Sequence, residues 1–152
     1  MSMRHFLVIF KDLPIERSSV KSGRISREVI SACRCVNVGL FVSGDLRRDV
    51  IVSLGLGNED NLRVISFPGF SLRRVSPDER SISFFLLKSI EKVVTMEQGN
   101  RFVMDNGIEL ICSSLSGLIE SWKSDLILVP PSNPERFILD TILSADRMES
   151  DT

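Results

Sequence analysis

The fold class follows from residues 5–56, which read HFLVIFKDLPIERSSVKSGRISREVISACRCVNVGLFVSGDLRRDVIVSLGL. The stretch opens with a short apolar run at 5–10, which predicts a strand buried on both faces. A polar segment at 11–23 follows and predicts a long loop. Over 24–41 the apolar residues recur at intervals of three and four, which predicts a helix with one core-facing stripe. Residues 50–56 then predict a second strand.

The same alternation continues through the rest of the chain. A turn-rich segment at 57–61 separates the second strand from a third at 62–67. Ser76, Pro77 and Glu79 form a capping-box pattern, with Ser76 as N-cap of a helix that we expect to reach Val94. Strands alternating with helices predict an α/β fold with a mostly parallel sheet covered by helices on both faces. Further expected elements are a strand at 108–112, a helix at 114–123, and strands at 125–129 and 136–139.

Composition narrows the class of protein. The 152 residues are 43% hydrophobic and 26% charged, which is typical of one soluble globular domain, expected here to span residues 1–152. No apolar run approaches the roughly 18 residues of a membrane helix, and the N-terminus lacks a signal-peptide pattern. Three cysteines and a single histidine, His5, do not match a four-ligand zinc site, so we expect no metal. Reduced thiols and the missing signal together predict a cytoplasmic protein.

The net charge of −1 conceals an uneven distribution. Residues 1–80 carry 13 Lys and Arg against 9 Asp and Glu, a balance of +4, whereas residues 81–152 carry 6 against 11, a balance of −5. On the predicted first helix, Arg24, Arg27 and Arg34 lie opposite the apolar stripe. Arginine suits bidentate phosphate contacts, so this half is a candidate RNA-facing surface. The alternative is an ordinary surface whose charges happen to segregate.

Two further clusters could carry chemistry. The segment 45–49 (DLRRD) follows the predicted first helix, and Arg73 with Arg74 precedes the capping pattern. Surface ion pairing and helix capping would explain both clusters. The functional alternative is a clamp on an RNA backbone with a carboxylate near the reactive base. Glycine-rich phosphate loops are absent from the sequence, and we expect His5 to be a buried structural histidine.

The order of four blocks resembles a known family. Residues 23–25 (GRI), 33–37 (CRCVN), 46–50 (LRRDV) and 72–81 (LRRVSPDERS) are similar to archaeal tRNA pseudouridine N1-methyltransferases of the SPOUT class. Together the blocks span about residues 4–94. Residues 133–139 (NPERFIL) are similar to the family's strand before its first cofactor loop.

The resemblance implies a homodimer that uses S-adenosylmethionine (SAM) to methylate N1 of a pseudouridine in the T-arm of tRNA. It implies that Asp49 is the base or orienting carboxylate, with Arg48 beside it. It further implies that Leu139 and Asp140 lie at the cofactor site. The residues that it implies for RNA binding are Arg24, Arg27, Arg34, Arg47, Arg73 and Arg74.

Departures from the family pattern leave alternatives open. Asp140 stands where the family has a small residue that lets the cofactor approach. The sequence stops at Thr152, before the segment that carries the other cofactor loops, so we expect the C-terminal trefoil knot to be incomplete or absent. The chain could be an active methyltransferase, an inactive relative that keeps an RNA-binding or dimerising half, or a truncated product.

Overall fold

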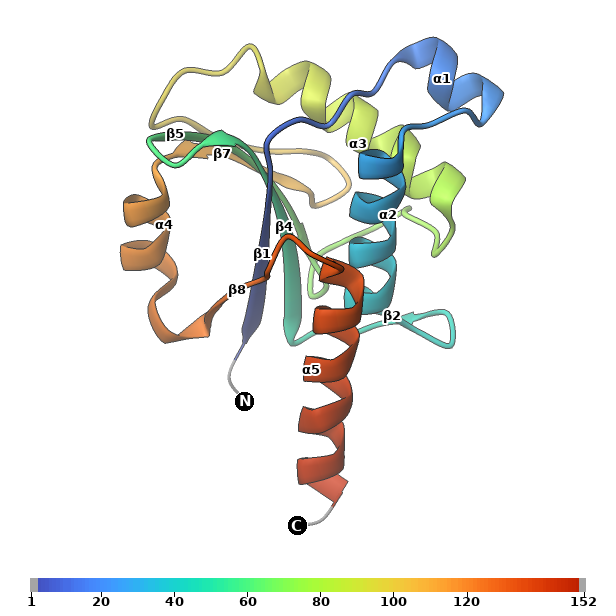
Figure 1. Ribbon diagram of the computed structural model, residues 1–152, viewed down its shortest axis with the longest axis vertical. Helices are drawn as coiled ribbons and strands as arrows, with labels where there is room; N and C mark the ends of the chain where they lie inside the picture. Colours follow the sequence, from blue (N-terminus) through green and yellow to red (C-terminus); the bar gives the residue numbers. More distant parts are fainter. Residues whose placement is uncertain (1–2, 151–152) are drawn as a thin grey trace.

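A six-stranded sheet forms the centre of the protein in the computed structural model, which describes the backbone of residues 3–150 and the side chains of residues 3–146. The strand order is β6-β7-β5-β4-β1-β8, and β2 pairs with β3 in a separate hairpin (Figure 1). The strands are β1 (Arg4–Phe10), β2 (Phe41–Val42), β3 (Asp45–Leu46), β4 (Val50–Asn58), β5 (Asn61–Pro68), β6 (Arg101–Val103), β7 (Glu109–Ser113) and β8 (Leu126–Leu128). The helices are α1 (Arg17–Ser22), α2 (Arg27–Leu40), α3 (Glu79–Val93), α4 (Leu115–Trp122), the 3₁₀ turn η1 (Lys123–Asp125) and α5 (Pro134–Ser150).

The sheet is mixed, which corrects the prediction of a mostly parallel one. β1 lies between β4 and β8 and pairs with both in parallel. The pairs β4–β5, β5–β7 and β6–β7 are antiparallel. The connection between β4 and β5 is a tight turn, which can join only antiparallel strands, whereas a parallel pair needs a crossover such as α2. The turn-rich segment at 57–61 therefore fixes β4 and β5 as an antiparallel pair.

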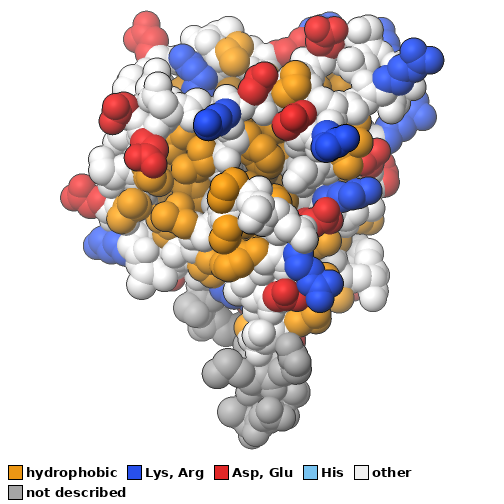
Figure 2. Space-filling model, viewed as in Figure 1, with side chains coloured by type: hydrophobic (Ala, Val, Ile, Leu, Met, Phe, Trp, Pro, Cys, Tyr) orange, Lys and Arg blue, Asp and Glu red, His pale blue; other side chains and the backbone are white. Residues whose placement is uncertain are grey.

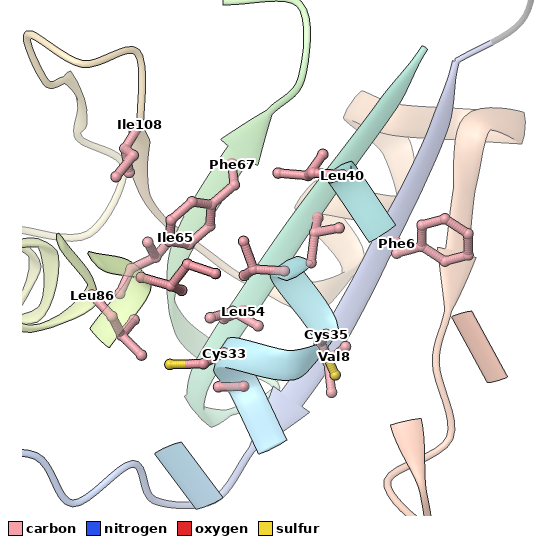
Figure 3. Packing of buried hydrophobic residues seen from close by; sticks show 14 of the residues in the cluster. Phe6, Val8, Cys33, Cys35, Leu40, Leu54, Ile65, Phe67, Leu86 and Ile108 are labelled. Carbon is pink, nitrogen blue, oxygen red and sulfur yellow. The ribbon is translucent and has the colours of Figure 1, made fainter. Parts of the chain in front are cut away.

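Helices cover both faces of the sheet, as predicted (Figure 1). Successive side chains of β1 point to opposite faces of the sheet. Phe6 and Val8 belong to the main core on one face, and Leu7 belongs to a smaller cluster with Leu118 of α4 on the other. The main core lies under α2, α3 and α5. Figure 3 shows Leu54, Ile65 and Phe67 of the sheet packed toward α2. These fully buried side chains hold the helices on that face.

Three helix boundaries differ from the prediction. α2 begins at Arg27 rather than at residue 24, because Ser26 is its N-cap and accepts a hydrogen bond from the Val29 N–H at 3.3 Å. α3 begins at Glu79 because Asp78, rather than Ser76, caps it by accepting from the Ser81 N–H at 2.7 Å. α1 occupies part of the predicted loop, and its single buried residue, Val20, provides no helical period to detect.

α5 replaces the strand that was predicted at 136–139. Pro134 begins the helix, and Ile138 and Ile142, one turn apart, are fully buried in the main core. α5 packs along α2, and Gly39 of α2 leaves room for the Val52 side chain of β4, which a Cβ atom there would overlap. The run 137–139 is apolar and reads locally as a strand, but the four-residue spacing of the two isoleucines agrees with the helix.

Among the described residues, no helix is both long enough and apolar enough to cross a membrane. The predicted state of the trefoil knot stays a prediction.

Candidate functional site

Two arginine blocks that are separate in the sequence meet at one edge of the sheet. Arg48 and Arg73 are both exposed and line the same depression, of about 400 Å³, with Phe70 and Leu72 on its wall. Arg48 lies just before β4, and Arg73 follows β5. Because β4 and β5 are antiparallel, the start of one strand and the end of the other lie at the same edge. The topology therefore brings the two cations together.

Two glycines let the loops of this site pack closely. A Cβ atom on Gly69 would overlap with the carbonyl oxygen of Arg47, and the Gly69 N–H donates to the Val50 carbonyl at 2.9 Å. Gly107 has a φ of +93°, and a Cβ there would overlap with the Ser71 carbonyl. Larger residues would separate the backbones that carry Arg48 and Arg73. The site thus depends on backbone contacts as well as on the arginines.

The backbone around Arg73 and Arg74 turns both side chains outward. Leu72 and Val75, which flank them, are buried, whereas both arginines are exposed. Arg74 has a left-handed φ of 66°, and the Arg73 N–H donates to the Asn106 carbonyl at 2.8 Å. A left-handed arginine is an uncommon, strained conformation that the surrounding contacts must hold. Asn106 was not identified from the sequence.

Asp49 is held in an ion pair with Arg4. The Arg4 Nη2 lies 3.1 Å from the Asp49 Oδ2, and the Arg4 N–H donates to the Asp49 carbonyl at 2.9 Å. The Asp49 side chain keeps 29% of its surface exposed, so a ligand can reach the carboxylate. Arg4 was not identified as a site residue, because its partner is 45 positions away and only the β1–β4 register brings them together.

The other predicted RNA-binding arginines do not join this site. Arg24 and Arg27 are exposed at the opposite end of α2, which is about 20 Å long by its 14 residues. Arg34, on α2, lies 3.7 Å from Glu135 of α5. Arg47 is mostly buried and pairs with Asp146 of α5 at 3.3 Å. The predicted RNA-binding residues therefore lie in three places. Arg73 and Arg74 lie in the loop after β5, Arg24 and Arg27 lie at the start of α2, and Arg34 and Arg47 form ion pairs with α5.

This location differs from the usual one in α/β folds. Asp49 and Arg4 lie at the amino ends of the parallel strands β4 and β1, whereas ligands commonly gather at the carboxyl ends. Two buried guanidinium nitrogens, Nη1 of Arg4, which pairs with Asp49, and Nε of Arg47, have no hydrogen-bond partner among the described residues. Unsatisfied buried donors of this kind favour an anionic or oxygen-rich ligand.

The histidine and the cysteines have structural environments. His5 is 6% exposed, stacks on Trp122 with ring centroids 3.5 Å apart, and shares a 2.7 Å hydrogen bond with Ser53. Burial lowers the pKa of His5 to about 4, so the ring is neutral near pH 7. The prediction of a buried structural histidine is confirmed.

The two cysteines of α2 are fully packed thiols. Burial, with the nearby Glu79, raises the pKa of Cys33 to about 12. Burial, with Glu135 and Cys33 itself, raises the pKa of Cys35 to about 12 as well. Figure 3 shows the two sulfurs pointing to different sides of the helix. Within residues 3–146, no group of three or more His, Cys, Asp or Glu side chains is arranged to hold a metal ion.

Comparisons with known proteins point to the same family as the four ordered sequence blocks. A family model described as SAM-dependent RNA methyltransferase matches residues 3–129. This chain belongs to the SAM-dependent RNA methyltransferase family. The match includes both arginine blocks of the candidate site. It also extends past Val94, beyond the four blocks that carry the sequence resemblance. The family resemblance drawn from the sequence is confirmed.

Three relatives of this family member carry the same name, tRNA (pseudouridine(54)-N(1))-methyltransferase. The relative from Natronomonas pharaonis is 35% identical over 153 residues, covering 95% of this chain and 72% of the relative. The relative from Methanococcus maripaludis strain C5 is 35% identical, covering 92% of the chain and 61% of the relative. The relative from Haloferax volcanii is 40% identical, covering 59% and 45%. The chain therefore spans less than two thirds of the length of the last two relatives.

The family uses SAM, but the predicted cofactor residues do not fit it in this structure. Leu139 and Asp140 lie within α5, where the helix satisfies their backbone N–H groups. The Asp140 side chain is exposed and paired with Arg136 at 3.2 Å, and Leu139 is half-buried. A cofactor loop would instead present free backbone donors in a cleft. The expected role of these two residues in a cofactor pocket is not supported by their geometry.

Proposed function

We propose that this chain acts on tRNA as a pseudouridine N1-methyltransferase with a SPOUT-type fold. The observation that carries the proposal is the meeting of Arg48 and Arg73 beside the Asp49–Arg4 pair. Exposed arginines on two loops can bind neighbouring phosphates, and phosphate contacts position an RNA without reading its sequence. The names of three relatives, and 35% identity over 95% of the chain, support tRNA as the substrate.

The proton at N1 of the pseudouridine must leave as the methyl group arrives. We assign its acceptance to the Asp49 carboxylate, which Arg4 holds in place at 3.1 Å. Arg48 is the sequence neighbour of Asp49 and would bind a phosphate beside the base. SAM is the family's methyl donor, and calorimetry with SAM measures its binding to this chain.

Replacing Arg48 and Arg73 together by Gln is expected to weaken T-arm binding and its dependence on salt. Each lost phosphate contact removes about one unit from the slope of log affinity against log salt, so the double variant should lose about two. Fluorescence anisotropy at several salt concentrations measures this slope. Arg136→Gln is the matched control, because Arg136 is 67% exposed on α5 and pairs only with Asp140 among the described side chains. An unchanged slope in the double variant would contradict the proposed site.

Replacing Asp49 by Asn is expected to slow single-turnover methylation of tRNA about 100-fold or more, since loss of a general base costs about that much. T-arm affinity should not fall, because Asn has nearly the same size as Asp and the change removes a negative charge that would repel phosphate. Asp45→Asn is the control, because Asp45 is an exposed carboxylate only four residues away. Equal rates for wild type and Asp49→Asn would remove Asp49 from the reaction.

We also propose that the protein forms a homodimer, as the sequence resemblance implies. β8 is an edge strand, and its Leu128 is 48% exposed; Ile119 of α4 is 45% exposed. Figure 2 shows hydrophobic side chains gathered on the face where β8 lies between α4 and α5. Apolar patches of this kind mark interaction sites. Light scattering under the conditions of the RNA measurements tests this proposal, because a homodimer has twice the mass of one chain.

The alternative is a relative that binds RNA without transferring a methyl group. The helical geometry of Leu139 and Asp140 is the observation that favours it. Calorimetry with SAM separates the two functions: heat of binding supports the methyltransferase, and its absence, with T-arm binding intact, supports the RNA-binding relative.

A further inference from the structure

The exposed side of α3 carries a row of cations and aromatic rings. Arg80, Phe84, Lys88 and Lys92 recur every four residues, so they follow one side of the helix over about 18 Å. All four side chains are exposed. Phe102, on the edge strand β6, extends the row beyond Lys92. We call these five residues the α3 stripe.

Phe84 is a large ring presented to solvent in a fixed setting. Its surface is 45% exposed. Phe85 meets it edge-on, with ring centroids 5.2 Å apart and an interplanar angle of 81°. The Lys88 ammonium lies 5.7 Å from the centre of the Phe84 ring. These contacts orient the ring and leave an aromatic surface open for another flat group.

Phe102 repeats the arrangement at the far end of the stripe. It is 43% exposed, and the Lys92 ammonium lies 4.7 Å from its ring centre. Lys92 is two helical turns from Phe84, about 12 Å along the axis. Stacked bases along a strand are about 3.4 Å apart, so the two rings would serve different nucleotides.

The described cations of the stripe have no acidic partner that would compete with phosphate. Among the described residues, Arg80, Lys88 and Lys92 form no ion pair with an acidic side chain. Glu91, beside the stripe, is already paired with Arg17 at 2.7 Å. Lysine is depleted in the cores of protein interfaces, so alternating lysines and rings suit a nucleic acid better than a protein partner.

The stripe is continuous with the candidate RNA site. A depression of about 510 Å³ is lined by Arg48 and, among other residues, by Pro77. A second depression, of about 460 Å³, is lined by Asp78, Arg80 and Phe84. Pro77 and Asp78 are adjacent in the chain, so the two depressions follow one another along the surface.

We propose that the α3 stripe binds a single-stranded segment of the RNA that occupies the Arg48–Arg73 site, with bases stacked on Phe84 and Phe102 and phosphates on Arg80, Lys88 and Lys92. The inference rests on the proposed function for the identity of that RNA. It adds a second contact region on a different element from the one that carries Asp49.

Two RNA probes separate the stripe from the arginine site: a T-arm hairpin alone, and the same hairpin with a single-stranded oligouridine extension. Anisotropy is measured for wild type, Phe84→Leu, Phe102→Leu and Arg48→Gln/Arg73→Gln. Leucine keeps the apolar volume and removes the aromatic face. The control is Val94→Ala, which alters an apolar residue that is 54% exposed just beyond α3. Circular dichroism and light scattering establish that each variant keeps its fold and mass.

The extension is expected to tighten wild-type binding, and each Phe→Leu change should remove about fivefold to 100-fold of that gain, as expected for one stacked base. Hairpin affinity should stay unchanged in both Phe variants. Phe84→Trp should keep the gain, and its fluorescence should be quenched when the extended RNA binds. The double arginine variant should bind the hairpin weakly and still gain from the extension.

The outcomes that overturn the inference are distinct from those that overturn the proposed function. Equal wild-type affinity for the two probes, or full affinity of both Phe variants for the extended probe, overturns the stripe alone. A change in mass for Phe84→Leu assigns the stripe to a protein contact and also overturns it. Failure of wild type to bind the hairpin, with the extension still bound, overturns the proposed site and supports the stripe.

Discussion

Replacing Gly69 by Ala is expected to lower the free energy of unfolding by about 3 kcal/mol and to weaken T-arm binding. The added Cβ would overlap with the Arg47 carbonyl oxygen and would lie 3.0 Å from that of Val50. Both are backbone atoms at the start of β4, so neither can rotate away as a flexible side chain could. The loop after β5 must shift, and this loop positions Arg73 against Arg48. Urea unfolding and anisotropy with the T-arm hairpin measure the two effects.

Gly55→Ala provides the control for this prediction. Gly55 lies inside β4, where the nearest atoms to a Cβ would be in the side chains of Ile9 and Leu7, at 3.5 Å, and Leu62, at 3.7 Å. We expect its stability to stay within about 1 kcal/mol of wild type, because alanine costs less backbone entropy than glycine and the contacts are ordinary. If Gly69→Ala were as stable as Gly55→Ala, the close packing of the two loops would not be required for folding.

Lowering the pH from about 6.5 to about 4 is expected to remove about 3 kcal/mol of stability through His5 alone. The native pKa, about 4, is below the ordinary value of 6.5 because burial disfavours the charged ring. Between these values the unfolded chain binds a proton that the native protein does not, so unfolding becomes easier as the pH falls. Above pH 6.5 the ring is neutral in both states and the full stability is present.

His5→Gln removes this titration and can still hydrogen-bond Ser53. The variant is expected to lack the loss of about 2 kcal/mol that His5 causes between pH 6.5 and pH 5, above the range in which ordinary carboxylates titrate. Asp125, Glu109 and Arg101 line the cavity next to His5 and are unchanged in the variant. Parallel pH profiles of the two proteins, measured by urea unfolding, would show that His5 does not control acid stability.

Long periodic stripes and short apolar runs both predicted elements that the structure contains. α2 and α3 bury regular stripes, and the run at 5–10 became strand β1, which pairs with β4 and β8. The prediction failed at 136–139, because three consecutive apolar residues agree with a strand or a helix equally well. Packing against α2 chose the helix there.

At the candidate site, too, residue types could be predicted from the sequence, but contacts between distant residues could not. Arg48, Asp49 and Arg73 were named as candidates because their residue types suit phosphate binding and proton transfer. Arg4 was missed, since ion pairing with Asp49 depends on the β1–β4 register rather than on a local pattern. Leu139 and Asp140 were assigned to a cofactor loop by resemblance, and their helical environment does not support that role.

Composition and periodicity were sufficient to predict an α/β fold with an arginine-rich half, and the resemblance of four ordered blocks to known proteins indicated the RNA methyltransferase family. Those properties depend on residue types and local spacing, which a sequence records directly. The strand directions, the partnership of Arg4 with Asp49, and the separation of Arg24 and Arg27 from Arg48 and Arg73 required the folded chain. They depend on which distant segments the hydrophobic core brings together, and core packing is a property of the whole chain.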